Sequence, residues 1–136
     1  MDLTGLKQLT TEIVGEEDLL RLLSSNKKLN HYIGFEISGL VHVGQGIMTG
    51  LVIRELQKLG VNCRIYMADW HSWINNKLGG DMELLKRASF EYFKPAMEHS
   101  LRIAGADVEK VEFVFGSELY DKNNRYWQTV VEVSKA

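Results

Sequence analysis

One stretch, residues 32–45 (YIGFEISGLVHVGQ), limits the folds open to this chain more than any other. It begins with β-branched and aromatic residues typical of a strand, and it breaks at the turn pair Ser38-Gly39. From His42 onward, apolar residues recur at helical spacing. A strand, a glycine-bearing loop and a helix in this order point backbone N–H groups into the loop, and the helix start favours an anion there. The sequence therefore predicts a β–loop–α unit with an anion site.

The glycines of this stretch leave room beside the backbone. Gly34, Gly39, Gly44 and Gly46 carry no side chain where a flat ligand could lie, and His42 can donate a hydrogen bond to a phosphate. The spacing matches neither the dinucleotide fingerprint G-x-G-x-x-G nor the phosphate loop G-x-x-x-x-G-K-[ST]. From the residues alone, two interpretations stay open: an anion site, or a βα turn whose glycines serve packing.

His42-Val43-Gly44-Gln45 resembles the HIGH signature of class I aminoacyl-tRNA synthetases and related nucleotidylyl transferases, with Gln45 in place of the second histidine. Five further blocks resemble archaeal tyrosyl-tRNA synthetases, in that family's order and at close to its spacing. From about residue 30 to its end, the chain therefore resembles the amino-terminal part of the catalytic domain of that family. The five blocks are Tyr32–Glu36, Ala68–Asn75, Gly79–Asp81, Val111–Val114 and Tyr126–Val130.

The resemblance implies a tyrosine pocket formed by Tyr32, Gly34, Ala68 and His71. The Tyr32 hydroxyl is expected to face the hydroxyl of the substrate, which discriminates against phenylalanine because that ligand leaves the buried polar group unpaired. Small residues at positions 34 and 68 make room for a ring. The alternative for Tyr32 is an ordinary side chain of the sheet that binds no ligand. The alternative for His71 is a histidine whose hydrogen bonds are all made within the protein at a helix start.

The resemblance also implies an ATP site formed by Glu36, His42, Gly44 and Gln45. His42 and Gln45 are the expected catalytic pair, which stabilises charge on the transferring phosphate, and Gly44 lets the adenine lie flat on the backbone. Gln45 keeps a neutral donor but cannot become cationic, so it puts the efficiency of the reaction in question. The alternative for Glu36 is a solvated carboxylate at a strand end.

Composition bounds the class of protein. The 136 residues suit one domain, and 45% hydrophobic residues supply a core. The net charge of −2 excludes an overall basic field for nucleic acid. The single cysteine, Cys63, falls in a predicted buried strand and is expected to be a core thiol in a reducing compartment. Without a membrane-length apolar run or a signal peptide pattern, we expect a cytoplasmic protein.

The order of expected elements is β-α-β-α-β-α, which predicts an α/β fold: the first half of a doubly wound, Rossmann-like parallel sheet with about three strands. Residues 1–29 are expected to form an N-terminal helical arm, and residues 30–136 the half-domain. The expected strands lie near residues 32–35, 61–69 and 111–115. The expected helices lie at residues 3–10, 16–25, 42–59, 70–74, 82–104 and 122–135.

Several side chains have expected environments. Pro95 should kink or split the helix over 82–104. Gly116-Ser117-Glu118 is expected to follow the third strand as a ligand-side position, and Asp121 to cap the last helix. The sequence shows no convergent carboxylate pair and no Cys/His spacing for a metal site. The residues expected to face the interior are Phe90, Tyr92, Phe93, Trp127, Val130, Val131 and Val133.

The function implied by the resemblance is that of a tyrosine–tRNA ligase, which forms tyrosyl-adenylate from tyrosine and ATP and passes the tyrosyl group to tRNA(Tyr). Mg²⁺ would arrive with ATP, and no tightly bound cofactor is implied. The KMSKS loop and the anticodon-binding domain of the family have no counterpart in these residues. We therefore interpret the chain as the amino-terminal half of a catalytic domain, and we expect it to be weak or inactive by itself.

Three other interpretations stay open. A non-catalytic interaction or nucleotide-binding module derived from this fold would pair with itself as a homodimer, or with the missing half, because a half-sheet exposes an edge strand. A small nucleotidylyl transferase would use the loop at His42 on another substrate. A tryptophanyl-tRNA synthetase is the nearest relative in architecture, and Tyr32 and the Ala68–Asn75 block argue against it.

Overall fold

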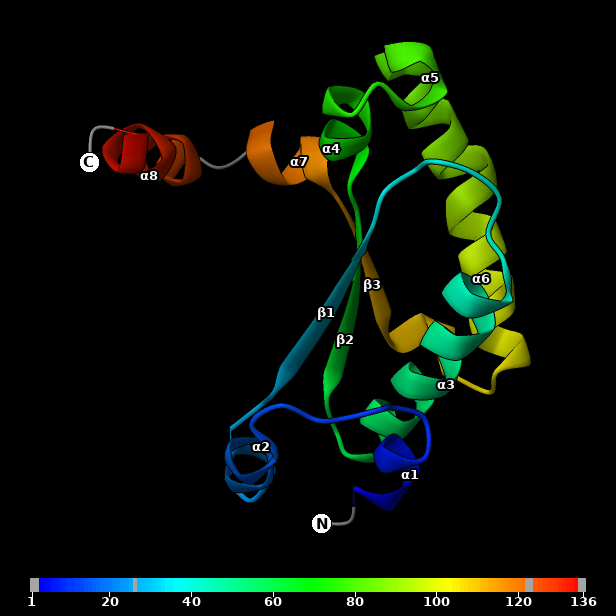
Figure 1. The fold of residues 1–136 in the computed structure, drawn as a ribbon, viewed down its shortest axis with the longest axis vertical. Coiled ribbons are helices and arrows are strands. Elements are labelled where there is room, and N and C mark those ends of the chain that lie inside the picture. Colours follow the sequence, from blue (N-terminus) through cyan, green and yellow to red (C-terminus); the bar gives the residue numbers. More distant parts are fainter. Residues whose placement is uncertain (1–2, 26, 122–123, 135–136) are drawn as a thin grey trace.

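A computed structural model describes residues 3–25, 27–121 and 124–134. Its centre is a sheet of three parallel strands in the order β1 (Asn30–Phe35), β2 (Asn62–Met67) and β3 (Val111–Phe115). Figure 1 shows the strands running together toward the end of the molecule that carries α4, α5 and α7. The predicted α/β half-sheet is confirmed, with β1 beginning two residues earlier than expected.

Helices from the long connections cover one face of this sheet (Figure 1). They are α3 (Val43–Lys58), α5 (Met82–Ala88) and α6 (Lys94–Ile103). Two shorter helices lie near the amino ends of the strands, α1 (Thr4–Lys7) and α2 (Glu16–Leu23), so the helix expected over residues 3–10 is shorter than predicted. The remaining elements are α4 (Asp69–Ile74), η1 (Lys77–Gly80), the π-turn η2 (Ser89–Phe93), η3 (Val108–Lys110), α7 (Gly116–Asp121) and α8 (Asn124–Ser134).

The hydrophobic core fills the space between the sheet and its helices. Ile53 of α3, Ile65 of β2 and Phe93 of η2 have no exposed surface. Cys63 is also buried, and burial raises the pKa of its thiol to about 11. The prediction of a core thiol is therefore confirmed, because a thiol held in its neutral form is a poor nucleophile.

Two glycines let α3 pack closely on α6. A Cβ atom at Gly46 would lie 2.4 Å from Ser100 Oγ, and one at Gly50 would lie 2.6 Å from Ala104 Cβ. Because the two glycines are one turn apart, they form a single groove along α3 that receives the neighbouring helix. Gly46 thus serves helix packing, and the expectation that it leaves room for a ligand is wrong.

Pro95 divides the long helix as predicted. Residues 89–93 form a π-turn, and Pro95 stands in the first turn of α6, directly after it. Because proline has no N–H to donate to the preceding turn, the regular α-helical hydrogen bonding is interrupted here. The neighbouring aromatic residues differ from expectation. Phe93 is buried, but the side chains of Phe90 and Tyr92 are 48% and 39% exposed, so the prediction that they face the interior is wrong.

The carboxyl-terminal segment also departs from prediction. Helix α7 starts at Gly116, directly after β3, in a segment for which no helix was predicted. In α8, Trp127, Val130 and Val133 are 41%, 41% and 69% exposed, because α8 extends away from the sheet and contacts mainly α7 (Figure 1). Their predicted inward orientation is wrong. The expected side-chain positions of Val131 and Asp121 lie outside the described residues.

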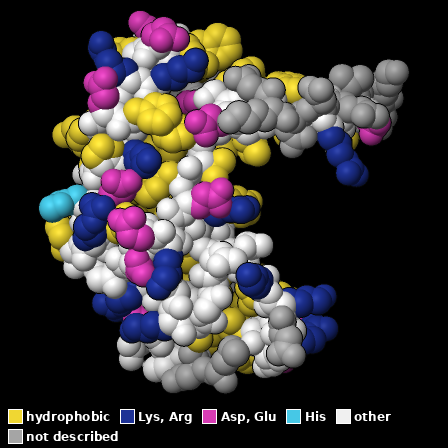
Figure 2. Space-filling model, turned by 180° about the vertical axis from the view of Figure 1, so that it is seen from behind, with side chains coloured by type: hydrophobic (Ala, Val, Ile, Leu, Met, Phe, Trp, Pro, Cys, Tyr) yellow, Lys and Arg dark blue, Asp and Glu magenta, His cyan; other side chains and the backbone are white. Residues whose placement is uncertain are grey.

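The second face of the sheet carries no helix within the described residues. Residues of β1, β2 and β3 that point to this side are open, and Tyr32 is the most exposed of the large ones at 78%. Figure 2 shows the molecule hollowed along this side, between the end that carries α7 and the end that carries α2.

No helix in the described ranges is both long enough and apolar enough to span a bilayer.

Candidate functional site

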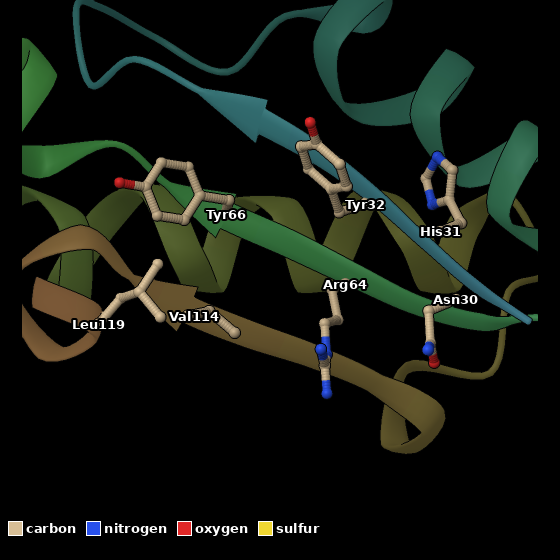
Figure 3. A pocket seen from close by; sticks show the side chains of 7 residues that line it. All are labelled: Asn30, His31, Tyr32, Arg64, Tyr66, Val114 and Leu119. Carbon is tan, nitrogen blue, oxygen red and sulfur yellow. The ribbon is translucent and has the colours of Figure 1, made fainter. Parts of the chain in front are cut away.

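A cavity of about 340 Å³ lies on the open face of the sheet (Figure 3). Its side chains come from all three strands and from α7. Asn30 and Tyr32, like Arg64 and Tyr66, stand two residues apart on their strand and so share the open face, whereas His31 borders the cavity from the other face of β1. Tyr32, the first residue of the predicted tyrosine pocket, lines it. The lining residues are Asn30, His31, Tyr32, Arg64, Tyr66, Val114 and Leu119.

The other three residues of the predicted tyrosine pocket lie toward the carboxyl end of the sheet. Gly34 follows Tyr32 on the same face of β1 and is exposed. Ala68 is buried between β2 and α4, and its N–H donates to the Phe35 carbonyl at 2.9 Å. His71 is exposed on α4. The structure thus joins Tyr32 and Gly34 on one surface and places Ala68 and His71 beyond the strand ends, outside the lining of the cavity. The roles of all four stay predictions.

The loop between β1 and α3 is fixed near both of its ends. Ile37 N–H donates to Ser72 Oγ at 2.7 Å, and that hydroxyl donates to the Ala68 carbonyl at 2.7 Å. Val41 N–H donates to Tyr92 Oη at 3.0 Å. Because α4 and the π-turn each hold one end, the loop presents a defined backbone to a ligand.

His42, Gly44 and Gln45 gather at the start of α3. His42 is the N-cap residue, with extended backbone and an exposed side chain. A Cβ atom at Gly44 would lie 3.3 Å from His42 Cε1 and Nδ1, so the imidazole lies against the first turn of the helix. Gln45 is half-buried in the same turn. The arrangement offers an imidazole and free backbone N–H groups to an anion at the positive end of a long helix.

Glu36 stands at the carboxyl end of β1 in a small polar cluster. Asn75 Nδ2 donates to its carboxylate at 2.5 Å, and Lys77 Nζ lies 3.4 Å from it. The hydrogen bond from Asn75, followed by the interactions with Lys77, lowers the pKa of Glu36 below its usual value. Glu36 is therefore an ionised acceptor that ties β1 to the segment after α4.

Asp69 follows shortly after β2, and no role was predicted for it from the sequence. Its carboxylate has no exposed surface and accepts hydrogen bonds from Trp70 N–H at 2.8 Å, Ser117 N–H at 3.0 Å and Ser117 Oγ at 2.6 Å. A Cβ atom at Gly116 would lie 2.6 Å from Asp69 Oδ1. Asp69 thus fixes the end of β2 to the start of α7, a helix that the sequence did not predict. The available signal was an Asp and a Ser that each follow a predicted strand.

His31 was also missed. It belongs to β1, and its Nδ1 is buried with no hydrogen-bond partner in the described structure. The imidazole borders a second cavity of about 180 Å³ beside α3, which Met48, Thr49 and Val52 help to line. Burial lowers the pKa of His31 below its usual value of 6.5. A charged imidazole is therefore disfavoured at this position.

Acidification should destabilise the fold through His31. Because the pKa of this group is lower in the folded than in the unfolded chain, the unfolded chain binds the proton first as the pH falls. The stability is complete above the ordinary pKa of 6.5 and decreases as the pH falls from there through the folded pKa. Urea unfolding midpoints of His31→Gln should fall less than those of wild type over this window. His99→Gln, at an exposed position, is the control, and an equal pH dependence of wild type and His31→Gln would contradict the prediction.

Within residues 3–25, 27–121 and 124–134, no three His, Cys, Asp or Glu side chains gather closely enough to hold a metal ion. At the carboxyl end of the sheet, the cationic side chain of Lys77 lies next to the predicted site residue Glu36. The candidate site consists of the loop between β1 and α3, the start of α3 and the cavity on the open face of the sheet.

Comparison with known proteins gives one family for most of the chain. Residues 24–135 match the family of class I tRNA synthetases described as "W and Y". The tyrosine–tRNA ligase of Thermococcus kodakarensis is 53% identical over 129 residues, which are 95% of this chain and 34% of that protein. The tyrosine–tRNA ligase of Pyrococcus horikoshii is 49% identical over 130 residues, which are 96% of this chain and 34% of that protein. The chain thus spans about a third of the length of the curated relatives it matches.

Solved structures agree with the sequence comparison. The crystal structure of tyrosyl-tRNA synthetase complexed with L-tyrosine from Pyrococcus horikoshii superposes with a TM-score of 0.85 and 45% identity, over 99% of this chain and 38% of that one. The corresponding complex from Archaeoglobus fulgidus gives a TM-score of 0.77 and 29% identity, over 99% of this chain and 41% of that one. Each superposition covers nearly the whole chain, so it includes the three strands and the segment around His42.

Proposed function

Because the chain belongs to the family of class I tRNA synthetases for tryptophan and tyrosine, we propose that it is part of a tyrosine–tRNA ligase. In this proposal the chain binds ATP at the start of α3 and the tyrosine side chain on the open face of the sheet. Tyrosine, ATP with its Mg²⁺, and tRNA(Tyr) are the substrates and partners of the complete enzyme, which works in the cytoplasm. This assignment extends to the chain what the names of its relatives say of them.

The observation that carries the proposal is that one strand, β1, joins the cavity to the glycine-bearing loop. Tyr32 lines the cavity near the middle of β1, and the same strand leads directly into the loop that ends at His42. A ligand with a ring at one end and an anion at the other fits this order, because the ring lies on the sheet and the anion lies at the helix start. An aminoacyl-adenylate has this form.

The proposed reaction joins tyrosine to ATP. The tyrosine carboxylate attacks the α-phosphorus, a carboxylate–phosphorus bond forms, the α–β phosphoanhydride bond breaks, and pyrophosphate leaves. His42 donates to the phosphate oxygens as their charge develops, and the Gln45 amide and the first free N–H groups of α3 add neutral donors. Gly44 leaves space for the adenine, and Glu36 accepts a hydrogen bond from the nucleoside part. The protein therefore contributes position and electrostatic stabilisation, without a covalent intermediate.

Tyr32→Phe tests the amino-acid assignment. The experiment is ATP–pyrophosphate exchange by the protein at its full natural length, with each of the twenty amino acids in turn. We expect tyrosine to support exchange, and we expect Tyr32→Phe to reduce the preference for tyrosine over phenylalanine by about 5- to 150-fold. Tyr32 is exposed in this structure, and in the proposed complex the substrate covers it, so that an unpaired substrate hydroxyl would cost about 1–3 kcal/mol.

Tyr92→Phe is the matched control, because it removes a hydroxyl that does not line the cavity. This variant should keep the wild-type preference for tyrosine, even where its rate changes. Exchange that depends on tryptophan, or on no amino acid, would refute the proposed substrate. An unaltered preference in Tyr32→Phe would refute the role of Tyr32 and leave the substrate assignment intact.

An interaction module is the second candidate, and the sheet itself favours it. Strand order β1-β2-β3 leaves the outer edges of β1 and β3 without a strand partner in the described part of the chain, and one face has no helix cover. Unpaired edges and open faces invite pairing with a second copy or another chain. Two measurements separate the candidates: light scattering gives the oligomeric state, and pyrophosphate exchange with tyrosine gives the activity. A monomer that shows this exchange supports the ligase over the interaction module.

A further inference from the structure

The backbone immediately before His42 is held by a side chain from a distant part of the chain. Val41 N–H donates to Tyr92 Oη at 3.0 Å, and the two residues are 51 positions apart. Figure 1 shows the loop between β1 and α3 crossing toward the helices α5 and α6 before it turns into α3, and Tyr92 belongs to the π-turn between those two helices. The hydrogen bond therefore ties the end of the loop to the helices behind the sheet.

The position of the His42 imidazole depends on this backbone. His42 is the N-cap residue of α3, but its side chain makes no capping hydrogen bond to the described helix. Its backbone is held on both sides, because Gly46 N–H donates to the His42 carbonyl at 2.8 Å and Tyr92 holds the residue before it. Without the contact to Tyr92, the backbone of His42 would be fixed from the helix side alone.

The residues just before Val41 give the loop little support. A Cβ atom at Gly39 would have no atom of the described residues within 4 Å, and the side chain of Leu40 is exposed. Val41 differs from them, because a Cβ atom at Gly46 would lie 3.1 Å from Val41 Cγ1, so the valine side chain lies against α3. Val41 is therefore the position at which the loop becomes fixed, and Tyr92 holds its N–H.

The π-turn that carries Tyr92 is a local departure from regular helix. Lys94 N–H donates to the Ser89 carbonyl, five residues earlier, so the turn holds one residue more than an α-helical turn. Two aromatic side chains leave it toward the sheet ends: the ring of Phe90 stacks on Phe115 at the end of β3, with ring centroids 4.0 Å apart, and Tyr92 reaches the loop that follows β1. Turns of this kind are frequent at functional sites.

We propose that Tyr92 is a positioning residue for the reaction with ATP: its hydroxyl holds the backbone of Val41 so that the imidazole of His42 faces the transferring phosphate. This inference rests on the proposed function and deepens it, because it adds a residue that does not touch the substrates and acts through His42. A donor that is already in place needs no reorganisation as charge develops, and a small misplacement of such a donor slows the reaction.

The test is a double-mutant cycle of Tyr92→Phe and His42→Ala in the protein at its full natural length, with kcat and KM measured by ATP–pyrophosphate exchange with tyrosine. Tyr92→Phe removes one hydroxyl and keeps the ring. We expect it to lower kcat by about 2- to 10-fold, the effect of one neutral hydrogen bond, and to leave KM for tyrosine unchanged. In the His42→Ala background the same substitution should change kcat by less than about twofold, because the residue through which Tyr92 acts is gone.

Phe90→Leu is the matched control, because it changes the other exposed aromatic side chain of the same turn, whose ring contact is with Phe115. This variant should keep the wild-type kcat even if its urea unfolding midpoint falls. A wild-type kcat in Tyr92→Phe, or an equal loss with and without His42, would overturn the inference while the proposed function stands. If wild type shows no exchange with tyrosine, the proposed function fails and the inference fails with it.

Discussion

Replacing His42 by alanine is expected to slow adenylate formation by about 10²–10³-fold, the effect of removing one donor that stabilises charge in a transition state. The imidazole of His42 lies against Gly44 at the start of α3, where phosphate charge is favoured. The measurement is active-site titration with ATP and tyrosine, followed as the burst of pyrophosphate. The free energy of unfolding should not change, because the side chain is exposed.

Two further variants make this result specific. His42→Gln keeps a neutral donor and should recover part of the rate, whereas His99→Ala removes an exposed imidazole on α6 and should have no effect. A normal burst from His42→Ala would show that the loop does not contact the reacting phosphate, and the ATP site would then have to lie elsewhere.

Asp69→Ala should lower the free energy of unfolding by about 3 kcal/mol or more. The substitution leaves the N–H of Trp70, the N–H of Ser117 and the Ser117 hydroxyl without their acceptor. These donors are partly buried, so each should cost about 1 kcal/mol, the lower end of the range for unpaired buried groups. Urea unfolding followed by circular dichroism measures the change. Because the partners join β2 to α7, the loss should appear in the global transition.

A double-mutant cycle with Ser117→Ala distinguishes the loss of the Asp69–Ser117 hydrogen bonds from the loss of packing that any truncation of Asp69 would cause. If the hydrogen bonds carry the effect, the double variant should lose less than the sum of the two single variants, since each single change already breaks the same contact. Additive losses, or a loss below about 1 kcal/mol for Asp69→Ala, would show that the buried carboxylate contributes little to stability.

The elements near the site could be predicted because their signals are local. The β1–loop–α3 unit follows from apolar periodicity and the turn at Ser38-Gly39, and the split at Pro95 follows from its missing N–H. The cysteine was correctly placed in the core by the alternation along β2. In each case the deciding residues lie within a few positions of one another.

What escaped prediction depends on partners far along the chain. Helix α7 starts at Gly116 because of Asp69, which lies 48 residues from Ser117. Gly46 faces Ser100 of α6, so its role in helix packing could not be predicted from the sequence around it. Trp127 has a helical repeat of apolar neighbours, but periodicity predicts an apolar face and does not tell what covers it.

The parallel sheet has a consequence for synthesis of the chain. The side chains of Asn30 and Asn62, paired across β1 and β2, are 32 residues apart, and those of Arg64 and Glu112, paired across β2 and β3, are 48 residues apart. Contacts between such distant residues form late, because the intervening chain must first be made and then closed into a loop. As the chain leaves the ribosome, α3 can coil early, but β2 waits with one edge unpaired until residues 111–115 emerge. During that interval the nascent protein presents an aggregation-prone edge, and the speed of translation sets how long it does so.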